Sequence, residues 1–215
     1  MTDTTETQMP NHTIASLCTR SHAISLEKGW VTAEGDPRTF ATTTNLHHSE
    51  LSEAMEEFRA HRGLDETYYE GPDGTRYSAL KEGADSSGYK PCGIPVELAD
   101  FVIRVCQWAG TSQAGAMLQV EFDVAMDRLP PAADAVLGFD DALAEMHMYV
   151  SIAHMTSRAV KTPSIALSAR IRPLAAALAV AFAFCKDNGI YLWAAIDEKE
   201  AFNRTRSFKH GGKAC

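Results

Sequence analysis

The stretch that decides the fold reads Ile94-Pro95-Val96-Glu97-Leu98-Ala99-Asp100-Phe101-Val102-Ile103. Proline is favoured in the first turn of a helix, and the chain then stays largely apolar as far as Ala109, just before Gly110. The pattern predicts a helix over 95–109 that is buried on nearly every side. Strand patterns are weak elsewhere, so the sequence predicts an all-α protein.

Two carboxylates interrupt this apolar helix. Glu97 and Asp100 are three residues apart, which places them on one face, one turn from each other. Burying an ionised carboxylate is costly unless the group is paired or binds a metal. Compensation of the helix dipole, together with an arginine partner, would account for Glu97 in the first turn but less easily for Asp100. The pair therefore indicates a bound cation.

A second acidic pair lies upstream, on a helix that we expect to begin near Thr42 and to end at 61–63. Glu50 and Glu53 are again three residues apart, and Glu50, together with Glu57, lies at the edge of an apolar stripe made of Leu51, Met55 and Phe58. An acidic helix face is most often only solvated. The case that Glu50 and Glu53 have a function therefore depends on the buried pair on the later helix. If the two helices pack antiparallel, four carboxylates face one gap.

The ligand types in that gap select the cation. Glu50, Glu53, Glu97 and Asp100 offer only oxygen atoms, and no histidine or cysteine motif converges with them. Oxygen ligands favour a hard cation such as Mg²⁺ or Mn²⁺ over zinc. A Mg²⁺ ion held in this way keeps positions open for water and for substrate phosphate.

Helical spacing recurs through most of the remaining chain. Further helices are predicted over 13–28, 113–128, 139–159, 170–186 and 192–205. Residues 1–12 are expected to be a disordered N-terminus, and 63–92, which contains five glycines and two prolines, a long loop. We expect a helical core from 13–110 and 187–213. Residues 111–186 would be a helical insertion, packed on that core or at an oligomer interface. The start of the 139–159 helix faintly resembles the approach to the helix that carries Glu50.

Composition excludes several classes of protein. The chain has 215 residues, 45% of them hydrophobic, and a formal net charge of -8, which indicates a globular protein and argues against binding a nucleic-acid polymer. Its longest apolar run, 174–185, is shorter than the roughly 20 residues of a membrane-spanning helix. The five cysteines form no Cys-x-x-Cys pair. With a polar N-terminus that lacks signal-peptide character, the sequence predicts a cytoplasmic protein without a membrane segment.

The C-terminal region concentrates positive charge. Residues 199–215 contain five basic side chains and one acidic side chain. Lys199, Asn203 and Arg206 fall on one helical face, where an ammonium, an amide and a guanidinium suit phosphate oxygens and a sugar or base edge. Beyond them, the Gly211-Gly212 pair would let Lys213 fold over a polyphosphate. The alternative is a tail that only aids solubility.

Four short motifs follow one another along the chain. They are Ser49-Glu50-Leu51-Ser52-Glu53-Ala54, Gly93-Ile94-Pro95-Val96-Glu97-Leu98-Ala99-Asp100, Lys199-Glu200-Ala201-Phe202-Asn203-Arg204-Thr205-Arg206 and His210-Gly211-Gly212-Lys213. Together they resemble the MazG-like branch of the all-α nucleoside triphosphate pyrophosphatase superfamily. The resemblance implies a MazG-like helical bundle with a four-helix core. Its implied reaction is hydrolysis of a (deoxy)nucleoside triphosphate to the monophosphate and pyrophosphate, in nucleotide-pool housekeeping or deoxynucleotide supply.

The same resemblance implies roles for individual residues. Mg²⁺, with Mn²⁺ as a substitute, would be held by Glu50, Glu53, Glu97 and Asp100, while Lys199 and Asn203 would contact the nucleotide. Glu53 is our first choice for the catalytic base and Glu50 the second. Trp30 is a candidate for stacking on a base, with core packing as the alternative, and His47, beside the acidic motif, is a candidate for lining the pocket.

Departures from the family pattern leave other functions open. The 43 residues between Glu53 and Glu97 make an unusually long gap, residues 111–186 interrupt a link that is generally short, and Ser207 stands where a proline is expected. One alternative is a dimeric dUTPase-like nucleotide hydrolase, which shares the carboxylate chemistry on a longer chain. Another is a catalytically silent helical oligomerisation or binding module. In each case the apolar helices of the insertion lead us to expect a homodimer.

Overall fold

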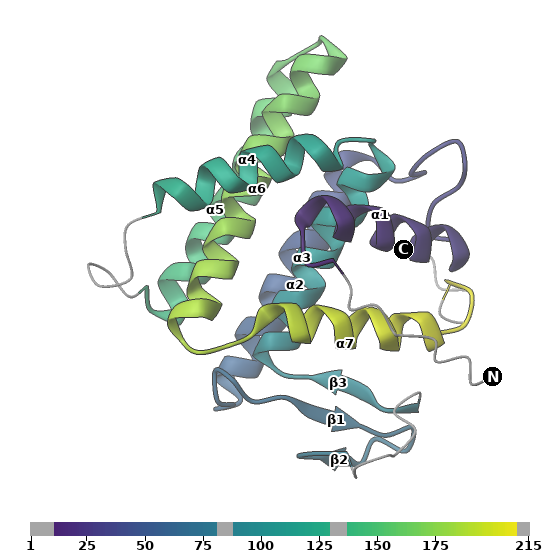
Figure 1. Ribbon diagram of the computed structural model, residues 1–215, viewed down its shortest axis with the longest axis vertical. Helices are drawn as coiled ribbons and strands as arrows, with labels where there is room; N and C mark the ends of the chain where they lie inside the picture. The colour runs from purple at the N-terminus through teal and green to yellow at the C-terminus, as the bar shows by residue number, and fades with distance from the viewer. Residues whose placement is uncertain (1–10, 81–87, 130–136, 210–215) are drawn as a thin grey trace, which may run out of the picture.

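The computed structural model describes residues 11–80, 88–129 and 137–209. These parts of the chain are predominantly helical, with one small sheet (Figure 1). The helices are α1 (Ile14–Glu27), α2 (Phe40–Arg59), α3 (Ile94–Thr111), α4 (Gly115–Arg128), α5 (Phe139–Ala159), α6 (Pro163–Asp187) and α7 (Leu192–Thr205). The predicted all-α character is confirmed. The predicted disorder of 1–12 falls mostly on residues outside the described part.

Threonine side chains start the first two helices. The Thr13 hydroxyl accepts a hydrogen bond from the Ser16 N–H, and the Thr39 hydroxyl accepts one from the Thr42 N–H. Each bond satisfies one of the free donors of a first helical turn. Because Thr39 is the cap, α2 begins at Phe40, two residues before the predicted start.

The predicted break at Thr162-Pro163 separates α5 from α6, but α6 is longer than predicted because it starts at Pro163 itself and not near 170. Proline at the first helical position loses no intrahelical hydrogen bond. The helix also continues through Pro173, which cannot donate to the Ala169 carbonyl one turn earlier. The Thr156 hydroxyl of α5 donates to that carbonyl instead, at 3.0 Å. By length and composition alone α6 could cross a membrane, but half of its most apolar window is buried inside the protein, as in a core helix.

The predicted loop over 63–92 is wrong in one respect, since it contains a three-stranded antiparallel sheet. The strands are β1 (Tyr68–Glu70), β2 (Arg76–Tyr77) and β3 (Lys90–Cys92), in the order β2-β1-β3. Strands of two or three residues are too short to show an alternating pattern in the sequence. Pro91 lies in the edge strand β3, where a missing N–H is tolerated.

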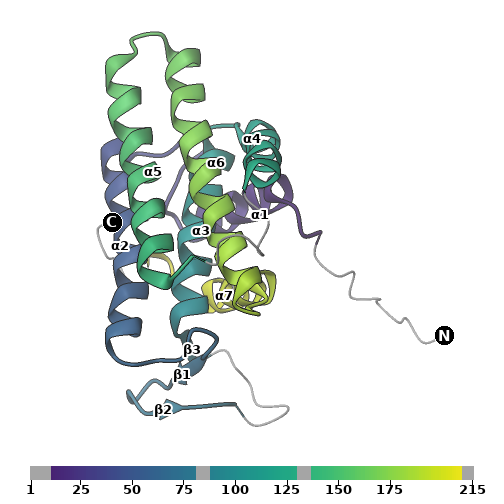
Figure 2. The same ribbon diagram turned by 90° about the vertical axis from the view of Figure 1, so that its left-hand side faces the viewer.

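Four helices, α2, α3, α5 and α6, run along the long axis of the molecule, while α1, α4 and α7 lie across them (Figures 1 and 2). Helix α3 packs on α1, α2 and α7, which are the other helices of the predicted core. Helices α4, α5 and α6 cover most of the segment 111–186, and its role as an insertion stays a prediction. They contact α1, α2 and α3 and share one continuous apolar core with them.

The chain contains two similar three-helix units. In the first, α1 and α2 both pack on α3; in the second, α4 and α5 both pack on α6; and α1, α2 and α3 touch α4, α5 and α6 respectively. Five buried positions of α2, namely Thr43, Thr44, His47, Leu51 and Ala54, correspond at a constant offset to buried Ala142, Leu143, Met146, Val150 and Ala153. His48 and His147 are separated by the same number of residues, 99, and their rings stack on each other. The faint sequence likeness therefore falls on two helices that bury the same set of positions.

Candidate functional site

Three carboxylates converge between α2 and α3. One ligand oxygen from each of Glu50, Glu97 and Asp100 lies within 4.8 Å of the others. The antiparallel packing that the sequence predicted for these helices brings the side chains together, and Glu50 and Glu97 are only 2% and 3% exposed. A set of carboxylate oxygens at this spacing could hold a hard divalent cation.

Glu97 is the least compensated member of this cluster. Its Oε2 atom is buried and has no hydrogen-bond partner among the described residues. Burial raises the pKa of Glu97 to about 7, and although the Lys199 ammonium opposes this rise, the Asp100 and Glu53 carboxylates add to it. A buried acceptor that lacks a donor needs another partner, and a bound metal ion would supply one.

Glu50 has a partial counter-charge in the Arg104 guanidinium of α3, with which it forms an ion pair. Burial nevertheless raises the pKa of Glu50 to about 7; Arg104 lowers it, whereas the Asp100 and Glu53 carboxylates raise it. Both glutamates thus bind protons far more readily than an exposed glutamate does. A divalent cation that replaced those protons would offset the repulsion among the ionised carboxylates of the cluster.

Lys199 of α7 occupies the other side of the cluster. Its Nζ lies 2.7 Å from Asp100 Oδ2, and its side chain is 2% exposed. Burial lowers the pKa of the ammonium, but the Asp100 and Glu97 carboxylates outweigh this effect and raise the pKa overall. In this structure Lys199 therefore fixes Asp100 and joins α7 to α3.

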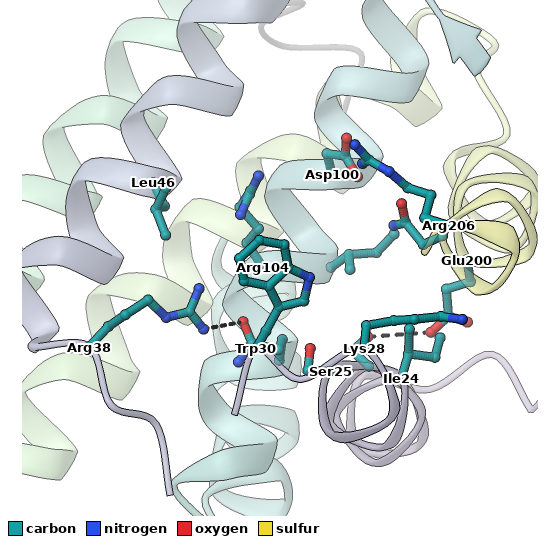
Figure 3. Close-up of a pocket in the computed structure, with 14 residues that line it drawn as sticks. Ile24, Ser25, Lys28, Trp30, Arg38, Leu46, Asp100, Arg104, Glu200 and Arg206 are labelled. Atoms are coloured by element: carbon teal, nitrogen blue, oxygen red, sulfur yellow. Dashed lines mark hydrogen bonds between the residues drawn. The ribbon is translucent and has the colours of Figure 1, made fainter. Parts of the chain in front are cut away.

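A pocket of about 290 Å³ opens beside the cluster. Its walls come from α1 and the turn after it, α2 and the segment before it, α3, and α7 with the residue after it. Asp100 belongs to both pocket and cluster. Four cationic side chains line it: Lys28, Arg38, Arg104 and Arg206. In Figure 3 the Trp30 ring occupies the middle of the view, with Arg38 and Leu46 on one side and Lys28 and Arg206 on the other.

The end of the pocket away from the carboxylates is polar and ordered. Asp36 accepts two hydrogen bonds from the Arg38 guanidinium, both 2.8 Å long, and a third from the Arg38 N–H. Arg38 Nη2 in turn donates to the Gln107 amide oxygen at 3.1 Å. This chain of contacts joins the segment before α2 to the middle of α3.

The structure distributes the predicted site residues unevenly. Trp30, Asn203 and Arg206 line the pocket together with Asp100. Glu53 is exposed and does not join the three-residue cluster, although its charge raises the pKa of both Glu50 and Glu97. The role of Glu53 as a metal ligand stays a prediction.

His47 does not line the pocket. His47 is fully buried and packs edge-on against Phe101. Burial, followed by the Arg104 charge, lowers its pKa to about 3, so the imidazole is neutral at physiological pH. Lys213 lies outside the described residues.

The chain beyond α7 is fixed beside the pocket as far as Lys209. The Lys209 N–H donates to the Lys28 carbonyl at 2.9 Å, and Lys28 Nζ donates to the Arg204 carbonyl at 2.6 Å. The Phe208 ring packs so closely on Gly29 that a Cβ atom there would lie 2.2 Å from it. These contacts close one side of the pocket around Lys28 and Arg206.

Sequence reasoning missed most of the pocket lining, including Arg38, Arg104 and Gln107. Arg104 and Gln107 were identifiable, because they continue the face of α3 that begins with Glu97 and Asp100 at helical spacing. Arg38 carries no such signal, since it precedes α2 in a segment without periodicity. Only the packing of that segment against Gln107 identifies it.

A second pocket, of about 220 Å³, occupies the equivalent place in the second three-helix unit. Ile24, Ser25 and Lys28 of the first pocket have the same spacing as Val124, Ala125 and Arg128 of the second. Asp100, Ile103 and Arg104 likewise match Ala176, Ala179 and Val180, and Tyr149 stands at the offset of Glu50. The second pocket thus lies at matching helix positions but lacks the carboxylate cluster: its lining holds Glu121, which pairs with Arg172.

No protein-family model, curated protein or solved structure matches this chain.

Proposed function

We propose that the chain is a Mg²⁺-dependent hydrolase that converts a (deoxy)nucleoside triphosphate to the monophosphate and pyrophosphate, on a helical fold of the MazG-like type. The observation that carries this proposal is the cluster of Glu50, Glu97 and Asp100, with the buried Glu97 Oε2 unpartnered among the described residues, at the mouth of a cationic pocket.

The charges near the cluster support a bound cation. Three carboxylates face two cations, Arg104 and Lys199, so that ionising all of them leaves one negative charge in a largely buried site. A bound divalent cation would make the net charge of the site positive, and the site would then attract a polyphosphate. When bound, it would act as a Lewis acid on phosphate oxygens.

The protein residues around the pocket suit the rest of such a substrate. Arg104 and Arg206 lie near Asp100, and Lys28 lines the opposite side of the same pocket (Figure 3). Their charges would bind and orient phosphate oxygens and stabilise the leaving pyrophosphate. Asn203 can donate to a sugar hydroxyl or a phosphate from the same side. The Trp30 ring and the apolar side chains Leu46 and Ile103 offer surfaces for a base.

Glu53 is the proposed general base. It is one helical turn from Glu50 and exposed to solvent, so that its carboxylate can accept a proton from an attacking water molecule. Glu50 is less suited to this role because it is buried and paired with Arg104.

The proposal is tested by a pyrophosphate-release screen over the common nucleoside and deoxynucleoside triphosphates, with Mg²⁺, with Mn²⁺ and with EDTA. We expect turnover only with metal. Glu53→Gln and Asp100→Asn should each lower the rate by at least about 10²-fold, the scale of losing a group that stabilises a transition state. Asp127→Asn, which changes an exposed carboxylate of α4, is the matched control. Turnover in EDTA, or near-wild-type rates in both site variants, would reject the proposal.

A further inference from the structure

Gln107, which lines the pocket, carries a hydrogen-bond donor without a partner among the described residues. The residue lines the pocket, yet it is only 7% exposed. Its Oε1 atom accepts from Arg38, whereas its Nε2 atom is buried without a partner among the described residues. A buried donor that lacks an acceptor is costly, and a ligand that supplies the acceptor removes the cost.

Arg38 fixes which end of the amide is available. A guanidinium has only donors, so the Gln107 oxygen must face it and the Gln107 NH₂ group must point elsewhere. Asp36 in turn holds Arg38 through two side-chain hydrogen bonds, and the Arg38 side chain is 6% exposed. Gln107 and Arg38 therefore present donors, and no acceptor, at this end of the pocket.

Gln107 lies as far from the carboxylates along α3 as the base of a nucleotide would lie if its phosphates were bound there. Gln107 follows Asp100 by seven residues on the same helix face, which corresponds to about 10.5 Å along the axis. Arg104 lies between them and also lines the pocket. With a polyphosphate at the carboxylate end, the Gln107 amide would meet the far edge of the base, beside the Trp30 ring.

We propose that Gln107, oriented by Arg38, selects nucleotides whose base carries a carbonyl oxygen at its far edge, the 4-position of a pyrimidine or the 6-position of a purine. This inference rests on the proposed function for the placement of the nucleotide. Uracil, thymine, guanine and hypoxanthine offer the acceptor. Cytosine and adenine place an exocyclic NH₂ group there, which would face the Gln107 NH₂ group and leave buried donors unsatisfied.

The test uses nucleotide pairs that differ at this position and in the protonation of the ring nitrogen beside it. Isothermal titration calorimetry compares dUMP with dCMP and dIMP with dAMP in the presence of Mg²⁺, and kcat/KM is measured for the four triphosphates. We expect the carbonyl-bearing member of each pair to be favoured at least about tenfold, the scale of a buried hydrogen bond.

One isosteric substitution should reverse the preference. In Gln107→Glu, one carboxylate oxygen keeps the contact with Arg38 and the other presents an acceptor, so dCMP and dAMP should become the preferred ligands. Gln113→Glu makes the same chemical change at an exposed position outside the pocket and should keep the wild-type preference. Equal affinities within each wild-type pair, or an unchanged preference in Gln107→Glu, would overturn the inference.

The two arms separate this inference from the proposed function. If triphosphates are hydrolysed without any preference within the pairs, the proposed function stands and the role of Gln107 is rejected. If the monophosphates bind with the expected preference but no triphosphate is hydrolysed, the role of Gln107 stands and the hydrolase is rejected. Absence of both binding and turnover rejects both.

Discussion

Glu97 is the residue on which the electrostatics of the site depend most. Glu50 pairs with Arg104 and Asp100 pairs with Lys199, but no cation is paired with Glu97, and one of its oxygens is buried without a partner among the residues described. Retaining a side chain in this state lowers the stability of the metal-free protein. This loss of stability is explained if Glu97 binds a ligand.

This cost predicts a dependence of stability on pH. The pKa of Glu97 is about 7 in the folded protein and near 4.5 when unperturbed, so the folded state binds more protons between these values. Its contribution to stability is therefore lost as the pH rises from about 4.5 to about 7. In EDTA, Glu97→Gln should raise the melting temperature at pH 8 and change it little at pH 4.5.

Calorimetry with Mg²⁺ completes this prediction. The metal should raise the melting temperature of the wild-type protein at pH 8 and raise that of Glu97→Gln less. Asp127→Asn, at an exposed position, should behave as the wild type does. A Glu97→Gln protein that is less stable at pH 8, or that responds fully to Mg²⁺, would show that Glu97 is a structural residue.

Lys199 shows a limit of sequence reasoning at this scale. Its helical spacing with Asn203 and Arg206 predicted a shared phosphate-binding face, and both of those residues do line the pocket. Lys199 itself is buried against Asp100. Periodicity gives the direction of a side chain on its helix, but the depth to which that helix packs depends on tertiary contacts. For the same reason His47, next to an acidic motif, is a core residue.

We expect Lys199→Met to destabilise the protein by about 3 kcal/mol, because removing one partner of a buried ion pair leaves the other uncompensated. Urea unfolding measures the loss. In the double variant Asp100→Asn/Lys199→Met much of it should be recovered, since no unpaired charge remains. If the losses of stability from Asp100→Asn and Lys199→Met were additive in the double variant, the two side chains would not form the proposed ion pair.

At the scale of elements, the small sheet positions the start of α3. Gly93, between β3 and α3, has a φ of 116° and accepts hydrogen bonds from the N–H groups of Val96 and Glu97. A Cβ atom at Gly93 would lie 2.2 Å from the Glu66 carbonyl oxygen. The sheet and the segment before it therefore press closely on the turn that carries Glu97.

Gly93→Ala should destabilise the protein by about 2 kcal/mol or more, because it combines an unfavourable φ with a backbone clash. Metal affinity should fall as well, since the clash displaces the first turn of α3. Gly74→Ala is the matched control: Gly74 has a φ of 77° but open space around it, so only the conformational cost of about 1 kcal/mol is expected. Equal losses in urea unfolding would remove the argument for close packing at Gly93.

Helix boundaries were predictable where a local signal sets them. Gly138 and Val160 flank α5, and α5 and α7 have the predicted bounds. The sheet could not be predicted, because its short strands are stabilised by contacts distant in sequence, such as the hydrogen bond that the Tyr69 hydroxyl donates to Glu198 at 2.5 Å. The start of α6 was misplaced because proline permits a helix start as well as a break.

At the scale of the whole molecule, the two three-helix units explain the segment 111–186. Its helices repeat the arrangement of α1–α3, and the stacked His48 and His147 rings lie where the units meet. The sequence gives only a faint trace of this relation, because a repeated fold needs the same buried positions and not the same residues. The predicted homodimer concerns a second chain and stays a prediction.

The second pocket has no carboxylate cluster, which predicts one metal site per chain. Tyr149, Ala176 and Val180 stand there in the places of Glu50, Asp100 and Arg104. The carboxylate in its lining, Glu121, pairs with Arg172. Isothermal titration calorimetry with Mg²⁺ and a nucleotide should give one binding event per chain. A stoichiometry of two would contradict the assignment of a single site.

The most direct test of the central claim is a ³¹P nuclear magnetic resonance spectrum of the products formed from dUTP and from dGTP. The proposed chemistry predicts resonances of the nucleoside monophosphate and pyrophosphate, formed with Mg²⁺, absent in EDTA and greatly reduced with Glu97→Gln. Release of nucleoside diphosphate and inorganic phosphate, product formation in EDTA, or unchanged triphosphates in the presence of Mg²⁺ would contradict the claim.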